Sequence, residues 1–313
     1  MHKLHLGSAA ILAAVFLSQP SSSFAAGLDG ITISEPLVHA NLAIYLLHGT
    51  SVPGAVPITL QQAFEKKSVR VNETGEVNRL TVDNLSDKEL FIQSGDIVTG
   101  GRQDRVIVSS LVLPPGAKNI ALDVFCVESG RWTARQGTEG VTFAAADSAM
   151  PSPTARAIIA QVAAAPQPVL GAFYEGGSSS LQEKMWAEAK KVQANLGKNL
   201  HTDAADPASP SSLALSLNAS KLQAAEKTFV DALRPQGLKD NDVVGFVVAV
   251  NGRVSKAEIY PSHALFRAMW EKELQAAAAE AIETDSTAKA ALPSRAAVQK
   301  SLDLASYGPA QQK

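Results

Sequence analysis

The stretch from residue 80 to residue 132 restricts the fold most strongly, because short β-prone segments alternate in it with turn residues. The segments are rich in Val, Ile, Leu and Phe and recur about every ten to fifteen residues. Gly, Pro, Asn, Asp and Ser, which favour turns, fill the connections. Parallel strands need longer crossovers, so this spacing predicts an antiparallel sandwich or barrel. The predicted strands are 80–82, 90–93, 105–112 and 120–127.

Helical patterns follow the strands, and one hairpin signal interrupts them. Apolar residues at helical spacing predict helices within 151–197, near 220–233 and in an Ala-rich run at 262–282. Asn251-Gly252 joins two β-prone segments and is a strong β-hairpin signal. The predicted fold is therefore α+β, with an antiparallel β-sandwich or barrel-like N-terminal part, packed helices and a C-terminal hairpin-plus-long-helix unit.

The first 25 residues have the pattern of a signal peptide. Lys3 lies in a short positive segment, an apolar run follows, and Ser23 and Ala25 occupy the −3 and −1 positions of a small-residue cleavage site. A membrane-spanning helix needs about 20 apolar residues, and here the polar break comes too early. We predict cleavage after Ala25 or Ala26, and export of a soluble protein to the periplasm or the medium without stable membrane insertion.

The mature chain is predicted to be a single elaborated domain over 26–283. Its parts are a β-rich region (27–150), a helical region (151–197), a Pro/Ser-rich surface loop (198–218) and a helix–hairpin–helix unit (219–283). An Ala/Ser/Gln-rich segment, 284–313, is predicted to be a mobile tail.

Charge and composition exclude several protein classes. With 28 Lys and Arg against 30 Asp and Glu, and no long basic run, the chain is not predicted to bind nucleic acid. A hydrophobic content of 46% excludes wholesale disorder. The single cysteine, Cys126, excludes a disulfide scaffold and a multi-Cys metal cluster, and its apolar neighbours predict that it is buried.

Catalytic and cofactor signatures are missing from the sequence. It has no G-x-S-x-G elbow, no P-loop, no H-E-x-x-H motif and no C-x-x-C motif. The histidines beyond the signal segment are too scattered to predict a metal site. No cofactor and no metal are expected, and catalysis is neither predicted nor excluded.

One region combines charged residues with glycines at neighbouring strand ends. Arginine forks and carboxylates gathered there predict a pocket for an anionic small molecule, with Asp104 or Glu128 as a potential acid or base. The alternative is mutual pairing, in which arginines and carboxylates pin the loops to one another. The candidate ligand-binding residues are Asp96, Arg102, Asp104, Arg105, Glu128, Arg131 and Trp132, with Arg135 nearby. By contrast, the run Glu271-Lys272-Glu273 is expected to be solvated surface.

Motifs spread over most of residues 30–283 resemble a single family. They are Leu80-Thr-Val-Asp-Asn-Leu-Ser, Gly95-Asp-Ile-Val, Gln103-Asp-Arg, Leu113-Pro-Pro-Gly, Cys126-Val-Glu with Gly130-Arg-Trp, Gln182 followed by Trp186, Val244-Gly-Phe-Val-Val-Ala-Val-Asn-Gly, and Leu265-Phe-Arg followed by Trp270. Together they resemble the domain family named for association with ARG and rhodanese/phosphatase-superfamily proteins, which has no known function. The resemblance implies a single domain and supplies no catalytic residue.

Three functions fit these observations. The first is an exported binding or interaction module, whose partner is an anionic small molecule or an envelope protein. The second is a cell-envelope hydrolase or lyase that uses Glu128 or Asp104 as acid or base with an arginine anion clamp. The third is a structural envelope protein, which would need an exposed apolar patch for self-association.

Overall fold

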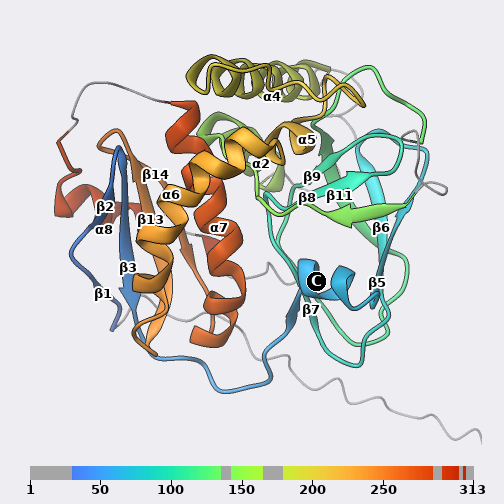
Figure 1. Ribbon diagram of the computed structural model, residues 1–313. Coiled ribbons are helices and arrows are strands. Elements are labelled where there is room, and N and C mark those ends of the chain that lie inside the picture. Colours follow the sequence, from blue (N-terminus) through green and yellow to red (C-terminus); the bar gives the residue numbers. More distant parts are fainter. Residues whose placement is uncertain (1–29, 135–141, 165–178, 285–290, 303–305, 308–313) are drawn as a thin grey trace, which may run out of the picture.

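The computed structural model describes residues 30–134, 142–164, 179–284, 291–302 and 306–307. The predicted signal peptide, residues 1–25, and Arg135 lie outside the described residues. Figure 1 shows a barrel of cyan and green strands on one side of the molecule, and a sheet of blue and orange strands with helices on the other.

Six antiparallel strands form the barrel. Their order is β12-β8-β9-β11-β6-β5, and the two outer strands contact each other, so the barrel is nearly closed. Inward and outward side chains alternate along β6, as a half-buried strand requires. The strands are β5 (Val69–Glu73), β6 (Arg79–Asn84), β8 (Ile97–Gly100), β9 (Arg105–Ile107), β11 (Ile120–Cys126) and β12 (Phe143–Ala145). The predicted α+β class and its barrel-like alternative are confirmed.

A small sheet packs into the core of the barrel. Its order is β10-β7-β4, with β4 parallel to β7, and its apolar side chains share the core that fills the barrel. Thr59 and Gln62 form a reciprocal capping box at the start of α1. The elements are β4 (Ile58–Thr59), α1 (Leu60–Glu65), β7 (Leu90–Ile92) and β10 (Leu111–Leu113).

The third sheet, called here the terminal sheet, joins the two ends of the chain. β3 pairs antiparallel with β13, and Asn251 and Gly252, both with positive φ, form the β13–β14 turn, which confirms the predicted hairpin. The order is β1-β3-β13-β14-β15, and β2 also pairs with β3. The strands are β1 (Thr32–Ile33), β2 (Leu37–His39), β3 (Leu42–His48), β13 (Val243–Val250), β14 (Arg253–Ile259) and β15 (Ser306–Tyr307).

Helix α7 lies at the centre of the molecule. It packs on the terminal sheet through β13 and contacts α6 and α4 (Figure 1). A single large core includes Phe246 of the sheet, Trp270 of α7 and Phe125 of the barrel, so the two sides are joined by shared apolar packing. The helices are α2 (Pro153–Ala163), α4 (Ser179–Asn199), α5 (Leu213–Leu217), α6 (Ser220–Gly237), α7 (His263–Glu283) and α8 (Arg295–Leu302).

The segment that was expected to be a mobile tail contains a packed helix. Val298 and Leu302 of α8 are buried against the face of the terminal sheet that points away from α7. Among the described residues, no helix combines the length and the apolar composition that crossing a bilayer requires.

Candidate functional site

Four of the predicted site residues meet at one end of the barrel. Asp104 and Arg105 lie at the start of β9, and Glu128 and Arg131 follow β11, which pairs with β9 through Cys126 and Arg105. We call Asp104, Arg105, Glu128 and Arg131 the barrel-end cluster. The side chains of Asp104, Arg105 and Glu128 are fully buried, and Arg131 is nearly so.

Arg131 uses all five of its N–H donors within the protein. Its Nε donates to Glu128 Oε1 at 2.7 Å, and its Nη2 lies 2.5 Å from Glu128 Oε2. The remaining donors bond to the backbone carbonyls of Gly100, Gly101 and Thr133. A guanidinium has five N–H groups, so Arg131 has none left for a bound anion.

The two carboxylates of the cluster are held equally firmly. Asp104 Oδ1 accepts from the Gly100 N–H at 2.8 Å, and Glu128 Oε2 accepts from the Asp104 N–H at 2.9 Å. The hydroxyls of Ser209 and Ser212 donate to Glu128 and Asp104, respectively. Burial acts to raise the pKa of Glu128, but hydrogen bonds from Arg131 and Ser209 outweigh it and hold that pKa below its usual value.

Ser209 and Ser212 were not predicted as part of this cluster. They belong to the segment 198–218, which was expected to be a surface loop, and both are buried. The Ser212 hydroxyl also accepts a hydrogen bond of 3.1 Å from the Leu215 N–H and caps the N-terminus of α5. A serine directly before an apolar helical run is the signal that could have indicated this capping role. Nothing in the sequence indicates that its hydroxyl reaches Asp104.

The remaining predicted residues have different surroundings. Trp132, 39% exposed, lies against the guanidinium groups of Arg102 and Arg105, which are 5.5 and 5.6 Å from its ring centre. Asp96 lies just before β8, whereas the barrel-end cluster lies beyond the other end of that strand. The Asp96 carboxylate pairs instead with Lys272 of α7. The structure therefore brings Asp96 to a different network.

Arg105 and Cys126 are also built into the interior. Arg105 Nε and Nη1 donate to the carbonyls of Val77 and Gln103, and its Nη2 lies 3.8 Å from Glu73 Oε2. Cys126 is a buried free thiol, and burial raises its pKa to about 12, which makes it unreactive. These contacts favour mutual pairing over an open anion site at the barrel-end cluster.

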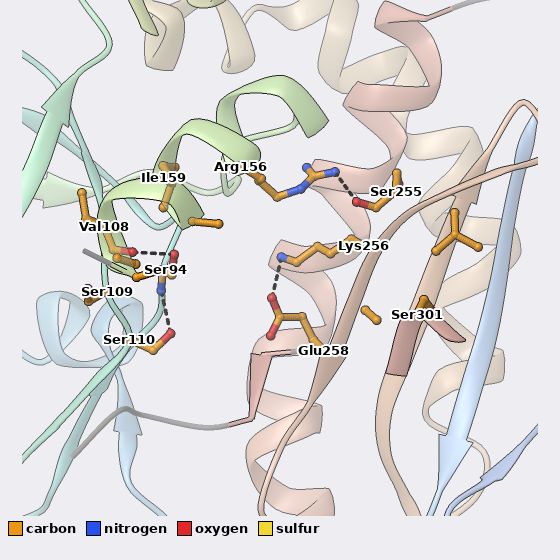
Figure 2. Close-up of a pocket in the computed structure, with 15 residues that line it drawn as sticks. Ser94, Val108, Ser109, Ser110, Arg156, Ile159, Ser255, Lys256, Glu258 and Ser301 are labelled. Atoms are coloured by element: carbon orange, nitrogen blue, oxygen red, sulfur yellow. Dashed lines mark hydrogen bonds and ion pairs between the residues drawn. The ribbon is translucent and has the colours of Figure 1, made fainter. Parts of the chain in front are cut away.

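A cavity of about 530 Å³ lies between the barrel and the terminal sheet (Figure 2). We call it the interface pocket. One side is formed by Ser94 and the residues that follow β9, another by the exposed face of α2, and the third by β14 with Ser301 of α8. The hydroxyl-bearing residues that line it are Ser94, Ser109, Ser110, Ser255 and Ser301, and the charged ones are Arg156, Lys256 and Glu258.

Ion pairs hold the charged wall of the pocket. Lys256 Nζ is 2.5 Å from Glu273 Oε2 and 3.5 Å from Glu258 Oε1. Arg156 Nη2 is 2.7 Å from Glu280 Oε2 and donates to the Ser255 carbonyl at 3.1 Å. Figure 2 shows Lys256 directed toward Glu258, and Arg156 directed toward the Ser255 backbone. The stronger ion pairs of both cations are with Glu273 and Glu280 of α7.

Behind this wall the polar network continues into the core. Gln93 Nε2 donates to Glu273 Oε1 at 2.8 Å, and Tyr260 Oη donates to Gln93 Oε1 at 3.1 Å. Lys272, next in sequence, pairs with Asp96. The expectation that Lys272 and Glu273 are solvated was wrong, because α7 is buried on nearly every side and each charge meets a partner from the barrel or the sheet.

Glu258 is the carboxyl of this network that lines the cavity. Burial raises its pKa, the Lys256 ammonium offsets part of that effect, and the Glu273 carboxylate adds to it, so that the pKa is raised to about 7. The pKa of Lys256 is raised above its usual value, because the attraction of Glu273 and Glu258 outweighs burial. The surroundings therefore favour the charged form of Lys256 and the protonated form of Glu258.

Across the residues that the structure covers, no group of three or more His, Cys, Asp or Glu side chains is placed to hold a metal ion. The interface pocket was not predicted, because its lining converges from segments far apart in the sequence. Its charged residues carry no local motif.

Comparison with known proteins identifies the family of this chain. Neither the curated proteins nor the solved structures include a match to it. Residues 30–313 match the pattern of the ARG and Rhodanese-Phosphatase-superfamily-associated Protein domain, which spans the barrel, the terminal sheet and all the described helices. The chain therefore belongs to the ARG and Rhodanese-Phosphatase-superfamily-associated Protein domain (ARPP-1) family.

Proposed function

We propose that this protein is an exported, non-catalytic binding module that holds a small molecule in the interface pocket. The observation that carries the proposal is the cavity itself: at about 530 Å³ it lies within the range of roughly 300–1,000 Å³ typical of small-molecule sites. Its lining also combines apolar side chains with serine hydroxyls and the charged residues Arg156, Lys256 and Glu258, which could orient a ligand.

The barrel-end cluster gives less support to a ligand. The N–H groups of Arg131 all donate to groups within the protein, and Asp104 and Glu128 are buried and hydrogen-bonded. Of the predicted ligand-binding residues in the described part of the chain, Trp132 is exposed, and Arg102 and Arg131 are half-buried. The donors of Arg131 are all used within the protein. The proposed ligand site is therefore moved from this cluster to the interface pocket.

The two other functions have weaker support. An acid or base must reach its substrate, and the side chains of Glu128 and Asp104 have no exposed surface. Self-association as a structural protein favours a contiguous apolar patch. Among the described residues, the large exposed hydrophobic side chains belong to separate segments: Val38, Val56, Val77, Leu85, Trp132 and Leu292.

Export is supported by the signal-peptide pattern of residues 1–25. Expression in a host that exports such proteins, followed by N-terminal sequencing of the soluble product, tests it. The proposal expects a product that begins at Ala26 or Gly27. A cytosolic product that retains Met1 contradicts it.

A thermal-shift screen with a panel of several hundred metabolites tests the binding function. A ligand that binds only the folded state raises the melting temperature by mass action. Ala160 of α2 is exposed and lines the pocket, so Ala160→Trp fills the cavity without disturbing the core. Ala157 is exposed on the same helix but does not line the pocket, and Ala157→Trp is the matched control.

The expected result is at least one stabilising compound whose effect is lost in Ala160→Trp and kept in Ala157→Trp. Compounds that stabilise both variants equally place the ligand elsewhere and contradict the proposal. A panel with no stabilising compound contradicts it as well.

A further inference from the structure

We propose that the interface pocket selects a small aliphatic amine and holds it as a monocation against Glu258. This inference rests on the proposed binding function and names the class of its ligand. It is carried by the way in which charges are paired around the cavity and by the composition of the remaining walls.

Each of three cations in or next to the pocket lining forms an ion pair with a close carboxylate. Arg156 bonds to Glu280 at 2.7 Å, Lys256 bonds to Glu273 at 2.5 Å, and Lys272 pairs with Asp96. Glu258 is the fourth carboxylate of the group, and its one ion pair among the described residues is the longer 3.5 Å contact with Lys256. The network of lining and adjoining core residues therefore holds three cations and four carboxylates. Arg156, Lys256 and Glu258 are its members that line the cavity, and Glu258 is the carboxylate without a close cation of its own.

A ligand cation next to Glu258 would balance this network. The charged and titratable groups around Glu258 are Lys256 on its own strand, Tyr260 just after that strand, Glu273 on α7 and Arg156 on α2. Without a ligand, burial and the nearby Glu273 carboxylate favour the protonated form of Glu258, in keeping with its raised pKa. A bound ammonium takes the place of that proton, so binding releases it.

The rest of the lining indicates an organic cation rather than a metal ion. A metal would need several oxygen ligands around one point, whereas here one carboxylate faces a cavity with walls of Ala160, Ala163 and Ala257. These walls suit a short alkyl chain. The hydroxyl of Ser109 makes no hydrogen bond with the described residues and offers an acceptor for a second N–H.

Aromatic side chains are missing from the described lining, and quaternary ammonium groups are recognised by aromatic cages. A primary or secondary amine, which keeps N–H donors for the Glu258 carboxylate, is therefore the better fit. Charge-assisted hydrogen bonds of this kind are about twice as strong as neutral ones.

A matched series of probes tests the selectivity. The n-alkylamines from butyl to octyl are compared at pH 7 with the alcohols and the carboxylates of the same chain lengths, by thermal shift and by calorimetric titration of the full mature chain. We expect at least one alkylamine to bind, and the matched alcohol and carboxylate to bind at least about tenfold more weakly, because neither can donate a charge-assisted hydrogen bond to the Glu258 carboxylate.

Variants locate the effect. Glu258→Gln keeps the shape of the side chain and removes its charge, so it is expected to weaken amine binding at least about tenfold while it leaves binding of the alcohol unchanged. Glu271→Gln, an exposed carboxylate on α7 that pairs with Arg234, is the control and is expected to change neither. The melting temperature of each variant without a ligand reports whether it folds.

Proton release gives a second readout. Amine binding measured at pH 7 in two buffers of different ionisation enthalpy is expected to release protons, since burial raises the pKa of Glu258 and the bound ammonium favours its ionised form. In Glu258→Gln this release is expected to disappear.

The outcomes separate this inference from the proposed function. If alcohols or carboxylates bind as tightly as amines and Ala160→Trp blocks them, the pocket function stands and the amine inference fails. Amine binding that survives Glu258→Gln, or a whole alkylamine series that does not bind, also overturns the inference. If, in addition, nothing in the wider panel binds in a manner sensitive to Ala160→Trp, the binding function itself fails.

Discussion

At the scale of single residues, the molecule treats its buried carboxyl groups in two ways. Glu128 is surrounded by donors from Arg131 and Ser209, and its pKa is lowered despite burial. Glu226 on α6 is also buried, but its Oε1 has no hydrogen-bond partner among the described residues, and burial raises its pKa to about 8. The number of donors within reach decides which charge state folding favours.

Glu226 is predicted to make stability fall as the pH rises. In the folded protein the Glu226 carboxyl keeps its proton up to about pH 8, whereas in the unfolded chain it loses the proton near its ordinary pKa of 4.5. Between these values the folded state binds more protons, so the free energy of unfolding decreases, by at most about 1.4 kcal/mol per pH unit. Urea unfolding of the wild type and of Glu226→Gln from pH 5 to 8 measures the difference, with Glu271→Gln as an exposed control.

The expected result is a shallower decrease in Glu226→Gln than in the other two proteins. Equal slopes in all three would show that Glu226 is ionised in the folded state.

At the scale of elements, a short segment before α5 fastens one end of the barrel. Ser209 and Ser212 donate to Glu128 and Asp104, which lie in the connections at the ends of β9 and β11. Leu213 and Leu217 of α5, which follows this segment directly, are buried in the core shared by both sides of the molecule. Hydrogen bonds from this Pro/Ser-rich stretch thus hold the connections at one end of the barrel in place.

Ser212→Ala is predicted to destabilise the protein by about 1–3 kcal/mol, because it removes both the N-cap of α5 and a donor to buried Asp104. Ser211 is the control, since its hydroxyl donates to the carbonyl of Ser129 at an exposed position. Ser211→Ala is expected to cost less than about 1 kcal/mol. Chemical unfolding of both variants compares them, and equal losses would contradict the role given to Ser212.

At the scale of the whole molecule, buried ion pairs of α7 connect the barrel with the terminal sheet. Lys272 reaches Asp96 at the start of β8, and Glu273 reaches Lys256 on β14. Removing one partner of a buried pair leaves the other charge without compensation, which is far more costly than removing both.

Lys272→Met is therefore predicted to lower the free energy of unfolding by about 3–5 kcal/mol. The double variant with Asp96→Asn is expected to recover a large part of that loss, as a double-mutant cycle measures. The exposed pair Arg234–Glu271, with an N–O distance of 2.9 Å, is the reference. Removing either side chain of this exposed pair is expected to lower the free energy of unfolding by less than about 1 kcal/mol. Additive losses for Lys272 and Asp96 would mean that the two side chains are not coupled.

The parts of this fold that could be predicted are those encoded by neighbouring residues. The strands near Leu80, Leu90 and Ile120 and the Asn251-Gly252 hairpin follow from local patterns, and the α+β class follows from them. The predicted strand 105–112 was wrong as one element, because it forms β9 and β10, which belong to different sheets. The interface pocket could not be predicted, since Ser94 and Lys256 meet only through the packing of the barrel on the terminal sheet. Lys272 looked solvated because its partner lies far away in the sequence.

The pairing of β3 with β13 has a consequence for how the chain is made. The two strands are separated by roughly 200 residues, so at typical synthesis rates of about 5–20 residues per second β3 waits about 10–40 s for its partner. During that time its apolar segment, Leu42–His48, presents an unpaired edge that favours aggregation. Since contacts of such long sequence separation also form slowly, we expect aggregation through β3 to compete with folding until β13 has been synthesised.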